Sequence, residues 1–368
     1  MKKVRDIFCV LLLLCTTMSC ENWLDVDPKT EIKSELMFQS VSGFKDALMG
    51  VYLTLRDPEL YGKEATWGFV DAIGQQTDIQ DQAAAYYNAS RYNYSQTSGV
   101  SDALWAKAFN AIVNLNNMLE NLDKQQNLFT PATYGVLKGE ALGLRAFLHF
   151  DLVRLFGWGN LAKKPENLEK LCMPYMTKYD KVLTKQLTVG EVLAHIEEDL
   201  LASIELLNNS DPYGLAPKQD DYDLPNEDKF FDNREKRFNY WAAVCTLTRV
   251  YMWMGRKGEA LTLAKSFIDK GGRTSWIDSY TIDAYYEKDR DLTFSREHVF
   301  ALDIAELFES VKHYIDPNAN KPNRNADLLY HSSERANKLF EAVNGVSTDY
   351  RYKRWYNKVN DFFDGWAF

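Results

Sequence analysis

One stretch, residues 139–157, constrains the fold of this chain more than any other. Apolar residues recur in and beside it at gaps of three or four, the spacing of one helix face; they are Leu137, Ala141, Leu144, Leu148, Leu152 and Leu155. A second apolar set lies beside the first and consists of Leu142, Ala146, Phe150 and Val153. A helix that is apolar on two sides packs on two sides. The pattern therefore predicts a helix inside a stack of helices, ending at Gly157.

The flanking sequence predicts the neighbours of this helix. Residues 31–57 are expected to form a first helical region, and residues 102–123 repeat Leu, Ile and Ala at helical gaps. Pro131 is expected to open the helix that contains residues 139–157. Thr188 and Glu191 form the Thr-x-x-Glu pattern of a capping box, which predicts that another helix begins there and continues through Leu207.

Residues 237–270 contain the clearest repeat. Leu247, Tyr251, Gly255 and Ala260 stand at the offsets of a tetratricopeptide helix pair, and a Gly255–Gly258 turn would let the two helices fold back. One such pair cannot bury its own apolar face, so neighbours must stack on it. The sequence therefore predicts a mainly α fold of stacked tetratricopeptide-type helix pairs. It also predicts an irregular, loop-rich portion and a few short strands, one of them over residues 297–302.

The N-terminus is typical of an exported lipoprotein. Lys2, Lys3 and Arg5 precede a short apolar run, and Ser19-Cys20 follows it. We expect residues 1–19 to be a lipoprotein signal peptide, Cys20 to be lipidated and residues 20–368 to form the folded domain. The alternative is an ordinary signal peptide with an incidental Cys. Since no later stretch is long and apolar enough to span a membrane, the lipid would be the only anchor.

Charge and cysteine content exclude several classes. A formal net charge of −9 argues against nucleic acid as a partner. Beyond Cys20 the chain has Cys172 and Cys245; Cys245 lies in an apolar helical run, so a free thiol is favoured over a disulfide. No spacing of Cys or His suits a metal. Acidic residues cluster within 208–236, which is either a solvated loop or, as the alternative, a calcium site.

Aromatic residues gather where the helical period is lost. Phe, Trp and Tyr make up 14% of the chain, and residues 58–101 are rich in them without a sustained period. A long irregular segment in a compact protein is usually functional. Aromatic rings can stack on the apolar faces of sugars, while Asp and Arg bond the hydroxyls. The candidate glycan-binding residues are therefore Trp67, Asp71, Asp78, Tyr86, Tyr87, Arg91 and Tyr92, with Trp276 and Tyr285 from a second aromatic stretch. The alternative is that these rings pack the non-helical half of the protein.

Several of these motifs agree, in chain order, with one known family. They are Leu24-Asp25 before Pro28, Gly139-Glu140-Ala141, Leu144-Arg145-Ala146, Phe150 and Phe156-Gly157. In these features the chain resembles the RagB/SusD family, the surface glycan-binding lipoproteins of Bacteroidetes. Members of that family usually run well beyond the point where this sequence ends, so the chain is expected to lack the C-terminal end of the SusD-like domain.

The resemblance implies a function. It implies a non-catalytic, lipid-anchored protein at the outer membrane, exposed on the cell surface. Such a protein would bind an oligosaccharide or polysaccharide and deliver it to a SusC-like TonB-dependent transporter. No cofactor is implied.

No motif of a known catalytic class appears in the chain. There is no Gly-x-Ser-x-Gly elbow, no His-Glu-x-x-His, no phosphate-binding Gly loop and no dinucleotide fingerprint. His149 lies within the apolar helix, where a satisfied core histidine is favoured over a catalytic one. We therefore expect a binding protein rather than an enzyme. The alternative is a surface-anchored glycan hydrolase, which would need two opposed carboxylates in a cleft.

Overall fold

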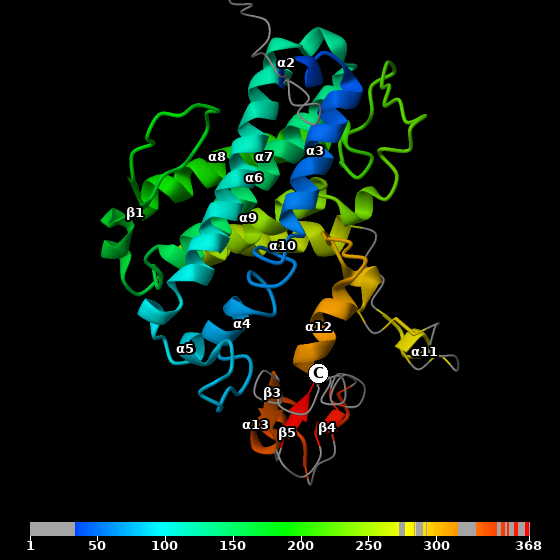
Figure 1. Ribbon diagram of the computed structural model, residues 1–368. Coiled ribbons are helices and arrows are strands. Elements are labelled where there is room, and N and C mark those ends of the chain that lie inside the picture. The colour runs from blue at the N-terminus through cyan, green and yellow to red at the C-terminus, as the bar shows by residue number, and fades with distance from the viewer. Residues whose placement is uncertain are drawn as a thin grey trace, which may run out of the picture.

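The computed structural model describes residues 34–271, 277–282, 284, 290–291, 293–315, 329–343, 347–349 and 352, with two further strands at 357–359 and 365–367. Long helices form a stack, drawn in the upper half of Figure 1. They are α3 (Val41–Leu55), α6 (Ser98–Lys124), α7 (Pro131–Phe156), α8 (Val189–Ser210), α9 (Tyr240–Met254) and α10 (Lys257–Lys270). The mainly α fold predicted from the sequence is confirmed.

Shorter elements connect the long helices. The helical ones are α2 (Ser34–Met37), α4 (Phe69–Ile73), α5 (Tyr87–Ser90), η2 (Tyr94–Gln96), η3 (Gln126–Leu128), η4 (Pro165–Glu169), η5 (Arg234–Lys236), α11 (Ser279–Ile282), η7 (Ser295–Glu297), α12 (Leu307–Ile315) and α13 (Ser333–Leu339). β1 (Leu171–Met173) pairs with β2 (Leu187–Thr188), and β5 (Gly365–Ala367) lies between β3 (Tyr330–Ser332) and β4 (Asn357–Val359). Both sheets are antiparallel.

The buried helix α7 lies at the centre of the stack. Both predicted apolar sets are buried almost without exception, so the two-sided packing is confirmed. Its glycines allow a close approach on one side. A Cβ on Gly143 would come 2.2 Å from the Phe238 ring and 2.7 Å from the Ser203 hydroxyl, and one on Gly139 would come 2.8 Å from Leu207. α8 can therefore lie directly against the backbone of α7.

The predicted helix ends are formed by the expected residues. Thr188 and Glu191 make both hydrogen bonds of a capping box at the start of α8. Pro131 occupies the first turn of α7, and the Gly157 N–H donates to the Val153 carbonyl oxygen at its end. A Cβ at Gly157 would lie 2.6 Å from that same oxygen, which is why a residue without a side chain ends the helix.

The helix pair at 237–270 is present as α9 and α10. Gly255 joins them with a φ of +78°, a left-handed conformation that favours glycine. Ala260, on α10, is 2% exposed. The Tyr251 hydroxyl donates to Glu197 Oε1 of α8 at 2.8 Å, so the pair is joined to the next helix of the stack.

Charged side chains from α7 are buried in two ionic clusters. Glu140 binds Arg234 and Arg237 in the segment before α9 and accepts a hydrogen bond from the Tyr52 hydroxyl of α3. Burial alone would raise the pKa of Glu140, but the two guanidinium groups outweigh it and lower that pKa. One turn and a half further on, Arg145 binds Asp199 of α8. These buried charges thus connect the central helix to its neighbours.

His149 is a satisfied core histidine, as expected. Its Nδ1 lies 2.8 Å from the Arg145 carbonyl oxygen, and its Nε2 lies 3.1 Å from the Met176 amide nitrogen that donates to it. Burial lowers the pKa of His149 to about 3, so the ring is neutral at physiological pH. Its ring stacks on Tyr175 with 3.9 Å between centroids.

One predicted strand is wrong. Residues 297–302 form no strand, because their backbone bonds to the segment before α9. The Ala301 N–H donates to the Lys236 carbonyl oxygen at 3.1 Å, and the Asn239 side chain donates to the Val299 carbonyl oxygen. Within the described ranges, no helix has the length and apolar character needed to cross a membrane.

Candidate functional site

The irregular segment 58–97 and the C-terminal elements lie together at one end of the helical stack. Figure 1 places α4 and α5 beside α12 and α13 there. Side-chain contacts join these parts of the chain. The Trp67 ring lies 5.3 Å from the Tyr314 ring of α12, and Arg335 Nη1 lies 2.9 Å from Asp78 Oδ1. The predicted binding segment is therefore folded against residues more than two hundred positions away.

Trp67 and Tyr86 pack in this contact region rather than face solvent. The half-buried Trp67 donates its indole N–H to the Gly62 carbonyl oxygen at 3.1 Å. Tyr86 is 4% exposed and donates its hydroxyl to Glu64 at 3.0 Å. A Cβ on Gly68 would lie 2.7 Å from the Tyr86 hydroxyl, so that glycine makes room for the Tyr86–Glu64 pair.

The two candidate carboxylates have different surroundings. Asp78 accepts from the Ser332 N–H at 2.8 Å and binds Arg335. Burial would raise the pKa of Asp78, but these hydrogen bonds lower it. Asp71 lies in the first turn of α4, and burial raises its pKa. Its carboxylate makes no hydrogen bond or ion pair with a described residue, so Asp71 retains its capacity to bind a hydroxyl.

The other candidates of this segment lie at the surface, with Tyr87 half-buried and the rest exposed. We call this surface the aromatic ridge and define it as Tyr87, Arg91, Tyr92 and Tyr94. Arg91 lies 5.5 Å over the Tyr87 ring, and the Tyr92 and Tyr94 rings lie 6.2 Å apart. Tyr92 is 53% exposed and Tyr94 is 57% exposed. Tyr94 was not among the predicted residues, although its place two residues after Tyr92 in an aromatic stretch is a usable signal.

The backbone under the aromatic ridge is held by local hydrogen bonds. The Tyr92 N–H donates to the Ala89 carbonyl oxygen at 3.0 Å, and Tyr92 itself has a φ of +58°. The Gln75 side chain donates to the Ser90 carbonyl oxygen at 2.6 Å, which ties the ridge to the residues that follow α4. These bonds fix the turn that presents the two exposed rings.

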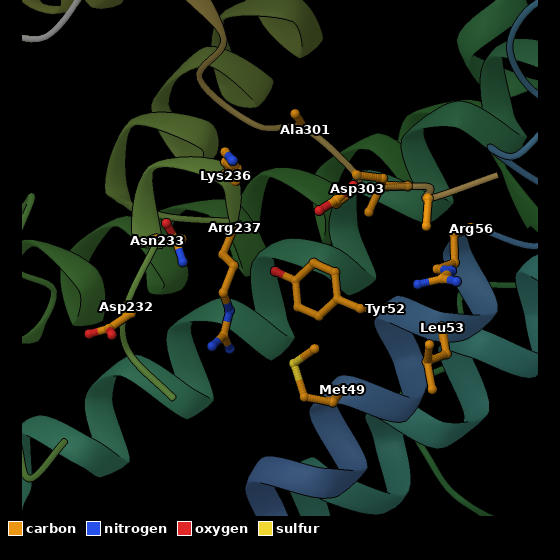
Figure 2. Close-up of a pocket in the computed structure, with 12 residues that line it drawn as sticks. Met49, Tyr52, Leu53, Arg56, Asp232, Asn233, Lys236, Arg237, Ala301 and Asp303 are labelled. Atoms are coloured by element: carbon orange, nitrogen blue, oxygen red, sulfur yellow. The ribbon is translucent and has the colours of Figure 1, made fainter. Parts of the chain in front are cut away.

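A cavity of about 370 Å³ opens beside the C-terminal end of α3. Figure 2 shows Arg56 and Leu53 of α3 on one side, Asp232 and Arg237 on the other, and Asp303 between them. The full lining is Met49, Tyr52, Leu53, Arg56, Asp232, Asn233, Lys236, Arg237, Ala301, Leu302, Asp303 and Ala305. Sequence reasoning missed this cavity because its walls come from three separate parts of the chain.

The charges in the cavity are only partly neutralised. Arg237 binds Glu140 and donates to the Phe230 carbonyl oxygen, but its Nη2 is buried without a hydrogen-bond partner among the described residues. Arg56, Lys236 and Asp303 form no salt bridge with the described part of the chain. Guanidinium, ammonium and carboxylate groups of this kind can bind hydroxyls or a charged group of a ligand.

Other predicted positions fall into two groups. Cys20, Trp276, Tyr285 and the segment 1–19 lie outside the described residues. Cys172 and Cys245 are free, and burial raises the pKa of the Cys245 thiol to about 11.

Two carboxylates of segment 208–236 bind basic side chains of the protein. Asp211 is buried against Arg234, and Asp228 binds Lys45 at 2.7 Å. Among the residues that the structure describes, no group of three or more His, Cys, Asp or Glu side chains could hold a metal ion. The calcium alternative for this segment thus has no cluster to support it in the described part of the chain.

A family profile described as "Starch-binding associating with outer membrane", named SusD-like, matches residues 22–219. Two curated relatives are SusD-like proteins P25 and P38 of Formosa agariphila. P25 is 26% identical over 190 residues, which cover 50% of this chain and 36% of P25. P38 is 26% identical over 210 residues, which cover 54% of this chain and 37% of P38. The matched part spans little more than a third of either relative.

Solved structures have the same fold. A putative sugar binding protein from Bacteroides vulgatus superposes with a TM-score of 0.62 at 21% identity, over 89% of this chain and 67% of that chain. A SusD-like carbohydrate binding protein from the same organism gives a TM-score of 0.62 at 16% identity, over 87% and 61%. At these identities the similarity concerns the fold alone.

Proposed function

Because the chain belongs to the SusD-like family of starch-binding proteins that associate with the outer membrane, we propose that it binds a glycan at the cell surface without cleaving it. It then passes the glycan to a SusC-like TonB-dependent transporter. The observation that carries the proposal is the aromatic ridge. In this ridge the Tyr92 and Tyr94 rings are each more than half exposed, and the exposed Arg91 lies next to Tyr92 in the chain.

The ridge has the chemistry that an oligosaccharide requires. Exposed aromatic rings offer flat apolar faces to the CH groups of a sugar ring, at low cost in side-chain entropy. Arg91 can donate several hydrogen bonds to hydroxyls. Asp71 adds a free acceptor in the same segment. The hydrogen-bonded turn beneath Tyr92 limits the freedom that binding would otherwise remove.

Trp67, Asp78 and Tyr86 support the ridge segment in this proposal. Their partners lie in the protein: Trp67 packs on Tyr314, Asp78 binds Arg335 and Tyr86 binds Glu64. They hold the segment in place, and the ligand contacts come from its exposed side chains. Trp276 and Tyr285 remain candidates from the second aromatic stretch.

The cavity beside α3 is a second place where a sugar could bind. The specific observation in its favour is that Arg56, Lys236 and Asp303 face one space without a salt bridge to a described residue. Such donors and acceptors suit hydroxyls. It has fewer aromatic side chains than the ridge, with Tyr52 alone on its wall. We therefore place the main binding surface at the ridge.

Location and partner follow from the same proposal. Lipidation at Cys20 would hold the protein at the outer membrane, where the SusC-like transporter would receive the glycan. The hydrolase alternative differs in one measurable product, since cleavage of a glycan releases new reducing ends.

The experiment is a binding screen of the purified chain on a glycan panel, followed by calorimetry with the best ligand. Tyr92→Ala combined with Tyr94→Ala should weaken that binding by about 1–3 kcal/mol, the scale of losing aromatic anchors. Tyr179→Ala is the matched control, because Tyr179 is 48% exposed on a different loop. Arg56→Ala with Lys236→Ala tests the cavity.

The outcomes separate the alternatives. Loss of affinity in the ridge variant alone supports the ridge, and loss in the cavity variant alone moves the site to the cavity. No ligand on the panel, or release of reducing ends during incubation, contradicts the proposed function.

A further inference from the structure

We propose that the loop tip formed by residues 178–185 contacts a surface of anionic lipid headgroups. The loop joins β1 to β2 and stands away from the helical stack at the left of Figure 1. The inference rests on the proposed outer-membrane location and adds a second point of attachment to it. It concerns none of the residues assigned to glycan binding.

Large apolar side chains at the tip have high exposed fractions. Leu183 is 96% exposed, Val182 is 70% exposed and Tyr179 is 48% exposed. Leu171, at the start of β1, is 60% exposed. Single exposed apolar residues are normal on protein surfaces, but a cluster on one projecting loop is typical of an interaction site.

Positive charge surrounds the apolar tip. Lys178, Lys181 and Lys185 are exposed, against one acidic residue of the tip, Asp180. None of the three lysines forms a salt bridge with a described residue. The wider segment 158–187 holds six lysines and three acidic residues, a net charge of +3 in a chain whose total is −9. This local excess is complementary to an anionic surface.

The base of the loop is fixed, so the tip is presented in a defined position. The Tyr175 hydroxyl donates to Asp199, and Asn116 donates to the Met176 carbonyl oxygen at 2.9 Å. The Tyr179 N–H donates to Glu120 Oε1 at 2.7 Å. Beyond Tyr179 the hydrogen bond within the described tip is local, from the Val182 N–H to Asp180. The apolar residues therefore lie past the last anchored position.

A second pair, at the base of the same hairpin, consists of residue types that favour the membrane–water interface. Lys170 Nζ lies 4.0 Å from the centre of the Trp158 ring, and Trp158 is 49% exposed. Tryptophan and lysine are residues that favour the boundary between headgroups and acyl chains.

The residue types favour a lipid surface over a protein partner. Lysine is depleted in protein–protein interfaces, where arginine and aromatic residues are enriched. Lysines around exposed leucine and valine match interfacial segments, whose apolar side chains enter the headgroup layer while the ammonium groups bind anionic lipids.

Vesicle sedimentation tests the proposal. The chain from residue 20 onward, with Cys20→Ser so that no acyl chain contributes, is mixed with vesicles of phosphatidylcholine alone or with phosphatidylglycerol. We expect binding to the anionic vesicles that falls with added salt. Val182→Asp with Leu183→Asp, and separately Lys181→Glu with Lys185→Glu, should each reduce the bound fraction by about fivefold or more.

The matched control is Ile268→Asp. Ile268 is also 70% exposed but lies on α10, and its replacement should leave vesicle binding unchanged. Absence of anionic-vesicle binding, equal binding to neutral vesicles, or an equal loss in the Ile268 variant would each overturn the inference. Loss of transporter association in the tip variants without vesicle binding would do so too and would make the loop a protein interface. Glycan affinity, measured on the same tip variants, should not change, so failure here is distinct from failure of the glycan site.

Discussion

Arg145 of α7 binds Asp199 of α8 through two parallel hydrogen bonds. Nε donates to Oδ2 and Nη2 donates to Oδ1, both at 2.7 Å. Nη1 donates to the Asn116 side chain of α6 at 2.9 Å. A single guanidinium group therefore joins three helices inside the stack, and a planar fork is the geometry that a lysine cannot reproduce.

Removal of this guanidinium should destabilise the protein strongly. Arg145→Ala leaves Asp199 buried without its counter-charge, so the free energy of unfolding should fall by about 3–5 kcal/mol. Arg154→Ala is the control, because its pair with Asp151 is on the surface and should contribute less than about 1 kcal/mol. Urea denaturation measures both. Similar losses in the two variants would contradict the structural role of Arg145.

The α9–α10 pair offers a test with adjacent residues. Ala260→Arg would place a charge at a position that is 2% exposed and should cost about 3 kcal/mol or more. Leu261→Arg, at a neighbouring position that is 55% exposed, should stay within about 0.5 kcal/mol of the unmodified chain. Thermal and chemical denaturation give both values. A melting temperature that Ala260→Arg leaves unchanged would argue against the buried position of that residue.

His149 predicts a pH dependence of stability. Burial lowers the pKa of His149 from 6.5 to about 3. Between these two pH values the imidazole is therefore protonated in the unfolded chain and neutral in the folded chain. The contribution of His149 to stability is therefore complete above pH 6.5 and falls as the pH drops toward 3, at up to about 1.4 kcal/mol per pH unit. His149→Gln should be less stable at pH 7 and should lack this part of the slope. Parallel slopes for the two chains between pH 6.5 and 5 would be inconsistent with a buried neutral ring.

Substitution of Trp67 should lower stability, whereas substitution of a ridge tyrosine should lower glycan affinity. Trp67→Ala removes a ring packed on Tyr314 and should lower the free energy of unfolding by about 2–3 kcal/mol. Tyr92→Ala should leave stability within about 0.5 kcal/mol and act on glycan affinity instead. Melting curves and calorimetry on both variants decide the matter. Weakened binding in a Trp67→Ala chain of unchanged stability would return Trp67 to the ligand surface.

Cys20→Ala tests the lipid anchor. The basic start, the short apolar run and Ser19 before Cys20 predict acylation of that residue. Without the thiol, the chain should remain unprocessed or be shed, and the outer-membrane fraction should lose it. Ser19→Ala, which keeps a small residue before Cys20, should fractionate like the original chain. Outer-membrane retention of the Cys20 variant at the original level would disprove the anchor.

The helical stack was predictable because its causes are local. The two apolar sets around residues 139–157, the capping box at Thr188 and the Gly255 turn each follow from a few neighbouring residues. The failed strand at 297–302 has the opposite origin. Its apolar residues suit a strand, but its hydrogen-bond partners are Lys236 and Asn239, which no local pattern reveals.

The sequence predicted which segment holds the candidate site, but it did not predict which of its side chains are buried or exposed. The aromatic segment was identified from lost periodicity, and Arg91 and Tyr92 are exposed on it beside the half-buried Tyr87. Whether a given ring packs or faces solvent depends on distant residues. Tyr314 covers Trp67, and no spacing within the segment encodes that contact. The cavity beside α3 depends on three distant segments and left no signal in any one of them.

The ion pair between Asp78 and Arg335 bears on the order in which contacts form as this chain folds. The two residues are 257 positions apart, so the pair can form only after residue 335 has been synthesised. α7 and α8 are close in sequence and can meet early, because short separations cost little chain entropy. Segment 58–97 therefore gains this ion pair later than α7 and α8 gain their contact. A chain that stops before residue 335 would hold the α7–α8 scaffold, and its segment 58–97 would lack this ion pair.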